Sequence, residues 1–265
     1  TGTQPLAGSS LEHETSAAVG QNLQASKAFV AADGATDVFC PLYSKAHTKK
    51  SQTTGAQVQN VSGSSVTVKF TVNAGGSTYG PYERTIAAGA SETFYAPQLT
   101  NPTIPAGTVG SATIESTGNV VAVVNDAGTD NGVDRKTTYA CFGAGGTTVN
   151  VPLAKEFAGG NTTGIQVQNV GDADTKVTLE YKATNGASIK IESIAMVAPG
   201  QSITAYGVSS PSSEWQVLAS SGSMSGTVNG VVVTADEPVV AIANESSANP
   251  NASGQDTKNY EGFSQ

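Results

Sequence analysis

The sequence predicts an all-β protein with two tandem antiparallel β-sandwich domains behind an extended N-terminal arm. The first observation is an internal repeat, because TTGAQVQNV at residues 53–61 returns as TTGIQVQNV at 162–170. The second is an alternation of apolar and polar residues inside each copy, which is typical of strands with one face on a core and the other in water. A repeat of about a hundred residues has the size of a whole sandwich domain and is too long for one rung of a solenoid. We therefore expect two domains.

Further matches extend the repeat on both sides of this motif. They are Pro41-Leu42 with Pro152-Leu153, Gly89 and Tyr95 with Gly200 and Tyr206, Val120–Ala122 and Asn125 with Val239–Ala241 and Asn244, and Tyr139 and Phe142 with Tyr260 and Phe263. These matches predict a first domain at residues 32–143 and a second at 144–265. Only Gly143–Gly146 separates them, so the pair should form a semi-rigid rod.

Residues 1–31 have no counterpart ahead of the second copy and are predicted to form the arm. A helix over Leu11–Lys27 is disfavoured because Gly20 interrupts it. A strand is expected only at Ala28–Ala31.

The strands of each copy follow from the period-two pattern. Val66–Val72 and Val177–Tyr181 alternate apolar and polar residues, whereas Val120–Val124 and Val239–Ala243 are apolar throughout, as central strands covered on both faces are. Turn-forming clusters separate the strands and give seven or eight strands per copy. The clusters are Ser62–Ser65, Ala88-Gly89, Asn131-Gly132, Asn185-Gly186, Pro199-Gly200 and Asn229-Gly230.

Composition excludes two classes of function. Charged residues make up 13% of the chain and the net charge is −8, so the protein would repel a nucleic-acid backbone. No apolar stretch approaches the roughly 20 residues of a membrane-spanning helix. The small, neutral side chains, and a chain that starts at Thr1 without Met, favour an extracellular or cell-surface location.

The two cysteines are predicted to form a disulfide. Cys40 lies in the first strand of copy one and Cys141 in its last, and copy two has Val151 and Gly262 at the aligned positions. Joint absence from copy two is what a bonded pair predicts, and two buried free thiols are the alternative.

No catalytic, cofactor or metal site is expected, so the chain is not predicted to be an enzyme. The only histidines, His13 and His47, lie in the arm and in a Lys-rich loop, and neither is repeated. The chain has few aromatic residues that could form a sugar-binding platform. Trp215 is the sole tryptophan, and the only local cluster is Tyr79, Tyr82 and Tyr95, of which Tyr95 is expected in the core. The oxygen-rich segment 125–134 could suit calcium, but its spacing favours a polar turn.

Two weaker patterns remain. Lys45 or Lys155, together with Asn125-Asp126 or Asn244-Glu245, could form a self-catalysed isopeptide bond, although an ordinary hydrogen-bonded Asn explains the repetition equally well. Four segments match the N-glycosylation sequon, which indicates surface exposure, although such matches also arise by chance in a chain rich in Ser, Thr and Asn. They begin at Asn60, Asn161, Asn244 and Asn251.

Taken together, the repeated motifs resemble those of large secreted cell-surface proteins of filamentous, often thermophilic bacteria. The motifs are the Pro-Leu strand, the Thr-Thr-Gly-x-Gln-Val-Gln-Asn-Val strand, the Val-Val-Ala-x-x-Asn-acid strand and the closing Tyr-x-x-Phe. The resemblance covers roughly residues 35–265. It implies surface-exposed, non-enzymatic, Ig-like modules.

The leading hypothesis is a structural subunit of an extracellular filament or surface layer. The partner is a second copy of the chain, contacted by the arm through Leu23, Phe29 and Val30, because an arm can add a strand to a neighbour's sheet edge. The alternatives are a secreted module that binds cell-surface glycans or mediates adhesion and, third, a secreted hydrolase.

Overall fold

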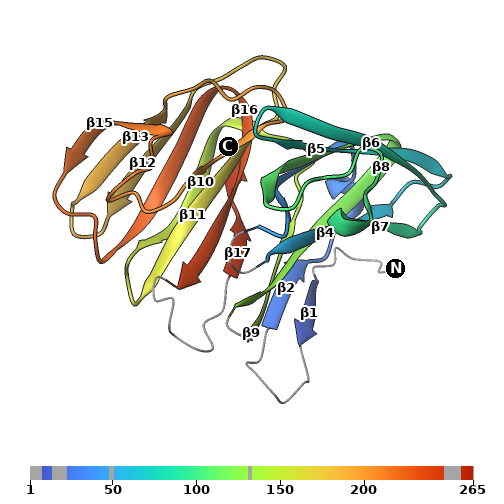
Figure 1. Ribbon diagram of the computed structural model, residues 1–265, viewed down its shortest axis with the longest axis horizontal. Coiled ribbons are helices and arrows are strands. Elements are labelled where there is room, and N and C mark those ends of the chain that lie inside the picture. The colour runs from blue at the N-terminus through green and yellow to red at the C-terminus, as the bar shows by residue number, and fades with distance from the viewer. Residues whose placement is uncertain (1–7, 14–22, 48–50, 131–132, 248–257, 265) are drawn as a thin grey trace. The chain divides into compact units, whose positions relative to one another are not determined.

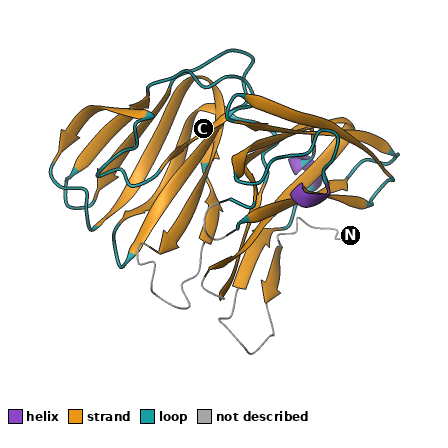
Figure 2. Ribbon diagram, in the orientation of Figure 1, coloured by secondary structure: helices purple, strands orange, loops and turns teal. Residues whose placement is uncertain are grey.

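A computed structural model describes residues 8–13, 23–47, 51–130, 133–247 and 258–264 (Figure 1). The chain divides into two compact units, unit 1 with residues 1–73 and 77–143 and unit 2 centred on residues 144–265. The protein is all-β, as the sequence predicts, and its strands pair antiparallel (Figure 2). The helical residues in the described part are two 3-10 turns, η1 (Ala31–Asp33) and η2 (Ala96–Gln98).

The arm forms a β-hairpin and not the single strand expected at Ala28–Ala31. Strands β1 (Ser9–His13) and β2 (Leu23–Lys27) pair with each other in a two-stranded sheet of their own. Residues after β2 lead through η1 into the body of unit 1. The sequence pattern missed this hairpin because neither of its strands, SSLEH and LQASK, has a strong apolar period.

Unit 1 holds seven strands in one sheet. They are β3 (Ala35–Lys45), β4 (Thr53–Asn60), β5 (Val66–Ala74), β6 (Ser77–Ile86), β7 (Ser91–Tyr95), β8 (Thr108–Asp130) and β9 (Val133–Ala140). Neighbours along the sheet run β6-β5-β8-β4-β7, and β3 and β9 both pair with β8.

The long strand β8 joins two halves of this sheet. Its residues 108–116 pair with β3 and β5, and its residues 120–130 pair with β4 and β9. Gly118 lies at the change-over, where a Cβ would come within 2.7 Å of both Ser62 Oγ and Val66 Cγ1. Because β8 pairs with strands along both of its halves, the seven strands of unit 1 form one continuous sheet and not two separate sheets.

Unit 2 repeats this arrangement. Its strands are β10 (Gly146–Glu156), β11 (Asn161–Asn169), β12 (Val177–Ala183), β13 (Ser188–Ser193), β14 (Ser202–Ala205), β15 (Trp215–Ser221), β16 (Thr227–Ser247), β17 (Lys258–Glu261) and β18 (Phe263–Ser264). Here β16 takes the place of β8, since it pairs with β10, β11, β12 and β17. Strand β15, at the end of the sheet, is an addition without a counterpart in unit 1.

The alternating segments place their apolar residues in the two cores, as expected. Val66, Val68, Phe70 and Val72 are buried in unit 1, and the Phe70 ring lies between Tyr43 and Phe94, stacked on the latter at 4.6 Å. In unit 2 the matching strand β12 buries Val177, Leu179 and Tyr181. The apolar segments 120–124 and 239–243 lie in β8 and β16 as central strands.

One predicted turn is wrong. Asn229-Gly230 lies inside β16, and the Asn229 side chain is buried, donates to the Ala154 carbonyl and accepts from the Thr227 hydroxyl. A tertiary partner for the amide therefore outweighs the local turn preference of the dipeptide. Gly89 and Gly200 do lie at turns with positive φ, as expected.

The last Asn of the repeated motif has a structural role in both units. The Asn60 amide donates to the carbonyls of Ser64 and Ile86 while its oxygen accepts from Ser62 N–H. Asn169 makes the matching three bonds to Ala173, Val197 and Gly171. Because Asn60 is buried and bonded on every side, the prediction that its sequon marks an exposed surface is wrong.

Candidate functional site

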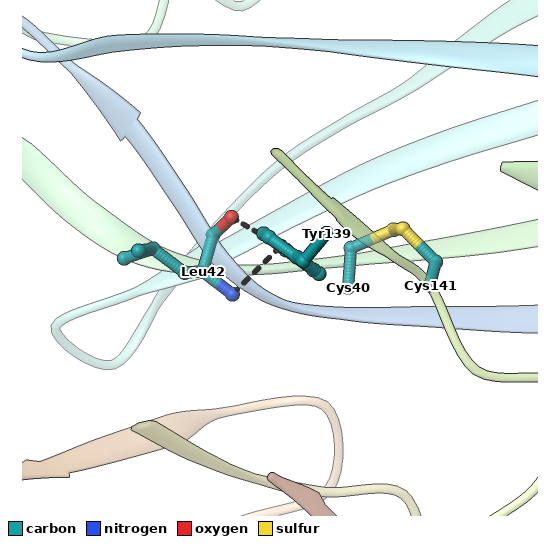
Figure 3. The surroundings of a disulfide bond; sticks show 4 residues. All are labelled: Cys40, Leu42, Tyr139 and Cys141. Carbon is teal, nitrogen blue, oxygen red and sulfur yellow. Dashed lines mark hydrogen bonds between the residues drawn. A yellow bond between two sulfur atoms is a disulfide. The ribbon is translucent and has the colours of Figure 1, made fainter. Parts of the chain in front are cut away.

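The predicted disulfide is confirmed. Cys40 and Cys141 are bonded with an S–S distance of 2.06 Å across a sequence separation of 101 residues, and the described part of the chain holds no free thiol (Figure 3). The bond ties β3 to the segment that follows β9. It closes a loop of nearly the whole of unit 1 behind the arm.

Unit 2 has filled the same place with apolar atoms. Cys141 N–H donates to the Ala122 carbonyl as Gly262 N–H donates to the Ala241 carbonyl, so the two positions are equivalent. A Cβ at Gly262 would lie 2.6 Å from Val149 Cγ1 and 3.5 Å from Val151 Cγ2. Valine side chains therefore occupy the space that the disulfide takes in unit 1, which explains why both cysteines are missing together.

The repeated Pro-Leu pair marks a bulge beside this bond. Between Cys40 and Tyr43 the strand advances one residue more than its partner β8, and the same shift recurs between Val151 and Ala154. Pro41 has no N–H to lose from the ladder, which suits it to a bulge. The Leu42 N–H is freed as well and donates to the Tyr139 hydroxyl at 3.1 Å, while that hydroxyl donates to the Leu42 carbonyl (Figure 3).

Removing the Tyr139 hydroxyl should destabilise unit 1. Tyr139→Phe leaves the buried Leu42 N–H and C=O without this partner, and such a loss costs about 1–3 kcal/mol. Chemical denaturation of the variant should show the loss in the unit 1 transition. Tyr95→Phe, at an exposed ring, is the control and should stay within about 0.5 kcal/mol of the wild type. Equal stability of both variants would contradict the role of Tyr139.

A buried carboxyl group occupies unit 1 on the inner side of the β4–β8 pair. Asp126 pairs with Thr54 in register and is 4% exposed. Its Oδ2 accepts from Gln52 Nε2 at 3.0 Å and its Oδ1 accepts from Ser44 Oγ at 3.4 Å. Burial raises the pKa of Asp126 to about 7, and the hydrogen bond from Ser44 lowers it only partly.

Unit 2 places a charged pair at the equivalent position. Glu245 pairs with Thr163 in register, and Lys155 Nζ lies 3.0 Å from its Oε1. Thr163 Oγ1 accepts from the Lys155 N–H just as Thr54 Oγ1 accepts from the Ser44 N–H. Lys155 is therefore equivalent to Ser44, and the sequence alignment of Lys155 with Lys45 is wrong by one residue.

The proposed isopeptide trio is not assembled. Glu245 and Asn244 are consecutive in β16, so their side chains point to opposite faces and Lys155 meets the carboxylate and not the amide. In unit 1 the side chain next to Asp126 is Ser44, and Lys45 instead belongs to the β3–β8 ladder opposite Thr108.

A tyrosine lies near the Glu245 carboxylate in unit 2. Burial raises the pKa of Tyr260 to about 12, a hydrogen bond with Thr163 lowers this pKa, and the Glu245 charge raises it.

The other residues considered from the sequence have structural places. Trp215 is buried and its indole N–H donates to the Thr204 carbonyl. Tyr82 is buried, whereas Tyr95 is exposed, so the prediction of Tyr95 as a core residue is wrong. His47 pairs through its main chain with Gln52, and the His13 side chain lies outside the described residues.

The oxygen-rich segment 125–134 forms the end of β8 and the start of β9, as the polar-turn interpretation expects, with residues 131–132 outside the description. Among the described residues, no group of three or more His, Cys, Asp or Glu is placed to hold a metal ion. No helix in the described part is long and apolar enough to cross a membrane.

The arm residues lie against the outer face of unit 1. Strand β2 runs beside β9 (Figure 1). Phe29 and Val30, together with Lys27, line one side of a groove of about 610 Å³, and Gln59, Val61 and Val123 line the other. Phe29 is half-buried under the Lys27 ammonium group at 5.4 Å, and Val30 is exposed. Leu23 begins β2, and its side chain lies outside the described residues.

The buried polar groups around Asp126 were missed from the sequence. Ser44, Gln52 and Thr54 come from two strands and an intervening loop, and only Thr54 belongs to a repeated motif. Its recurrence as Thr163 was the available signal, since a threonine kept on an inward-facing position indicates a buried hydrogen bond.

Comparison with known proteins gives weak similarities. No family model and no curated protein matches the chain. Among solved structures, the Anabaena sensory rhodopsin transducer is 21% identical with a TM-score of 0.30, and the match covers 34% of this chain and 92% of that one. The protein 1070 of Thermotoga maritima is 16% identical with a TM-score of 0.34, covering 42% of this chain and 95% of that one. Similarities at this level assign neither a family nor a function.

Proposed function

We propose that the protein is a structural subunit of an extracellular filament or surface layer, built from two Ig-like sandwiches and assembled head-to-tail through its arm. The observation that carries the proposal is the independence of the arm hairpin. Strands β1 and β2 pair with each other in a sheet of their own, and within the described residues neither of them pairs with a strand of the main sheet. Such a hairpin can detach from the body of its own subunit and dock on a neighbouring subunit without disrupting the core of either unit.

The connection between arm and body supports this exchange. After β2 the chain passes through Ala28–Val30 and η1 before β3 begins. Asp33 accepts from the Val30 N–H and pairs with the Lys27 ammonium group at 3.1 Å, and these contacts, with the Val30 N–H foremost, lower the pKa of Asp33. The pair is exposed, so it orients the connection and contributes little to stability.

The disulfide and the amino-acid composition support an extracellular setting. A disulfide between Cys40 and Cys141 persists in an oxidising environment and is rare in a reducing one. A surface of small, neutral side chains fits the same setting.

Deletion of residues 1–31 is the test of the proposal. The full chain is expected to form regular polymers in negative-stain microscopy and in light scattering, and the shortened chain is expected to remain monomeric. Its far-ultraviolet circular dichroism should stay rich in β-structure, since β3–β18 are intact. A shortened chain that forms the same fibres, or a full chain that stays monomeric at all concentrations, would refute the proposal.

A pair of full-length variants tests the docking role of the arm without removing the arm itself. Val30→Asp places a charge on an exposed arm residue that lines the groove, and Val217→Asp places one at an equally exposed site on β15. Only the first should reduce polymer formation, because only Val30 belongs to the docking segment.

A further inference from the structure

The two units have kept an outer face while their cores have changed. Several core positions differ, among them Tyr43 against Ala154, Phe70 against Leu179 and Phe94 against Ala205. The residues on the face turned away from the core of the β4–β7 and β11–β14 pairs are identical, although Gln57 is partly exposed and Gln166 is buried. They are Gly55, Gln57, Ser91, Thr93 and Tyr95 in unit 1 and Gly164, Gln166, Ser202, Thr204 and Tyr206 in unit 2.

Each face presents one tyrosine ring lying over a glycine. Tyr95, at the end of β7, is 39% exposed, and Tyr206, which directly follows β14, is 49% exposed. A Cβ at Gly55 would lie 3.5 Å from Tyr95 Cδ2, and one at Gly164 would lie 3.2 Å from Tyr206 Cδ2. The glycine therefore lets the ring lie close to the sheet, with its other side open to a ligand.

The polar side chains next to each ring are held in fixed positions. Gln57 Nε2 donates to Ser91 Oγ at 2.8 Å, and its Oε1 accepts from the Thr93 hydroxyl. Gln166 makes the same two bonds with Ser202 and Thr204. Gln57 is partly exposed and retains a second N–H for a partner, whereas Gln166 is buried, and each serine retains its hydroxyl hydrogen. Side chains that are already ordered lose little rotamer freedom on binding.

We propose that Tyr95 and Tyr206 are the centres of two equivalent binding platforms for a neutral glycan. An open aromatic ring stacks against the C–H face of a pyranose, and amide and hydroxyl groups beside it bond sugar hydroxyls. All the kept side chains of the face are uncharged, which matches a neutral ligand and offers no counter-charge to an anionic or cationic one. The inference is independent of filament assembly, because the rings lie on the strands and not on the arm.

A repeating polymer long enough to reach both platforms would be bound more tightly than by either platform alone. Native affinity electrophoresis tests this in gels that contain one neutral polysaccharide each: hydroxyethylcellulose, soluble starch, galactomannan or xylan, with pull-down on chitin as a fifth probe. Wild-type protein should be retained by at least one of them. Tyr95→Ala and Tyr206→Ala should each weaken retention about tenfold or more, and the double variant should abolish it.

Controls distinguish the ligand from other causes. Tyr79→Ala alters a half-buried tyrosine of β6 away from the platform, and it should leave retention unchanged. Circular dichroism and thermal melting verify that each variant is folded. Deletion of residues 1–31 should leave single-chain retention intact, so a failure of the filament proposal does not affect this result. The inference is overturned if wild-type protein is retained by none of the five probes, or if the double variant is retained as strongly as the wild type. It is also overturned if the double variant loses only self-association, because the face would then be a protein contact.

Discussion

Reduction of the Cys40–Cys141 disulfide is expected to destabilise unit 1 by about 4–5 kcal/mol and to leave unit 2 nearly unchanged. The bond closes a loop with a sequence separation of 101 residues, so its removal frees much conformational entropy in the unfolded chain. Unit 2 has no such bond, and its Val149 and Val151 side chains fill the equivalent space with apolar contacts.

Denaturant unfolding with and without a reductant measures this difference. Under oxidising conditions the transition of unit 1 should lie well above its position under reducing conditions. The double variant Cys40→Ala, Cys141→Ala is the control and should show no response to the reductant. Equal shifts of both transitions, or no shift of either, would contradict the assignment of the stabilisation to unit 1.

The internal repeat made much of the fold predictable. Comparison of the two copies located the central strands β8 and β16, because a residue type that recurs at the same position of both copies indicates a similar environment there. The same comparison paired the cysteines, because both are absent from the second copy. The period-two pattern identified the core residues of β5 and β12, because successive side chains of a strand point to opposite faces of the sheet. These signals are local, or they are carried by the repeat.

What the sequence could not supply depends on contacts between distant segments. Asn229 lies in a strand because the Ala154 carbonyl, far away in sequence, accepts from its amide. Lys155 was aligned with Lys45 because residue type was matched without the Thr54 and Thr163 hydrogen bonds that fix the register. The arm hairpin was missed because neither of its strands has a strong apolar period.

The candidate sites show the same division. The disulfide could be predicted from two residues and their joint absence from the second copy. The Tyr95 and Tyr206 platforms could not, because the sequence favours tyrosine in a β-strand as core, and only the register shows these rings opposite Gly55 and Gly164 on the outer face. Asp126 was recognised from the sequence as part of an oxygen-rich segment and of the isopeptide trio but not as a buried acid, since its burial depends on Ser44 and Gln52.

Asp126→Asn is expected to stabilise unit 1 at pH 8 and to leave its stability nearly unchanged at pH 4. Burial raises the pKa of Asp126 from its ordinary value of 3.8 to about 7 in the folded protein. Between these two values the folded state holds a proton that the unfolded state has released, so stability is fully present below about pH 4 and falls as the pH rises towards 7. A shift of this size corresponds to at most about 4 kcal/mol.

Asparagine copies the neutral form of the acid and carries no charge to bury. Its amide can donate to Ser44 Oγ and its oxygen can accept from Gln52 Nε2, so both present partners are retained. Thermal melts of the wild type and the variant from pH 4 to pH 8 should therefore diverge as the pH rises. A variant that is less stable than the wild type at pH 8 would refute the burial penalty.

The equivalent change in unit 2 should act in the opposite direction. Glu245→Gln removes the partner of Lys155 Nζ, which lies 3.0 Å from the carboxylate, and leaves a largely buried ammonium group without a counter-charge. Removing one member of a buried ion pair destabilises a protein, because the remaining charge keeps its desolvation penalty. One position of the duplicated sheet thus holds a lone acid in unit 1 and an ion pair in unit 2. Neutralising the acid at the two positions should raise the stability of the first unit and lower that of the second.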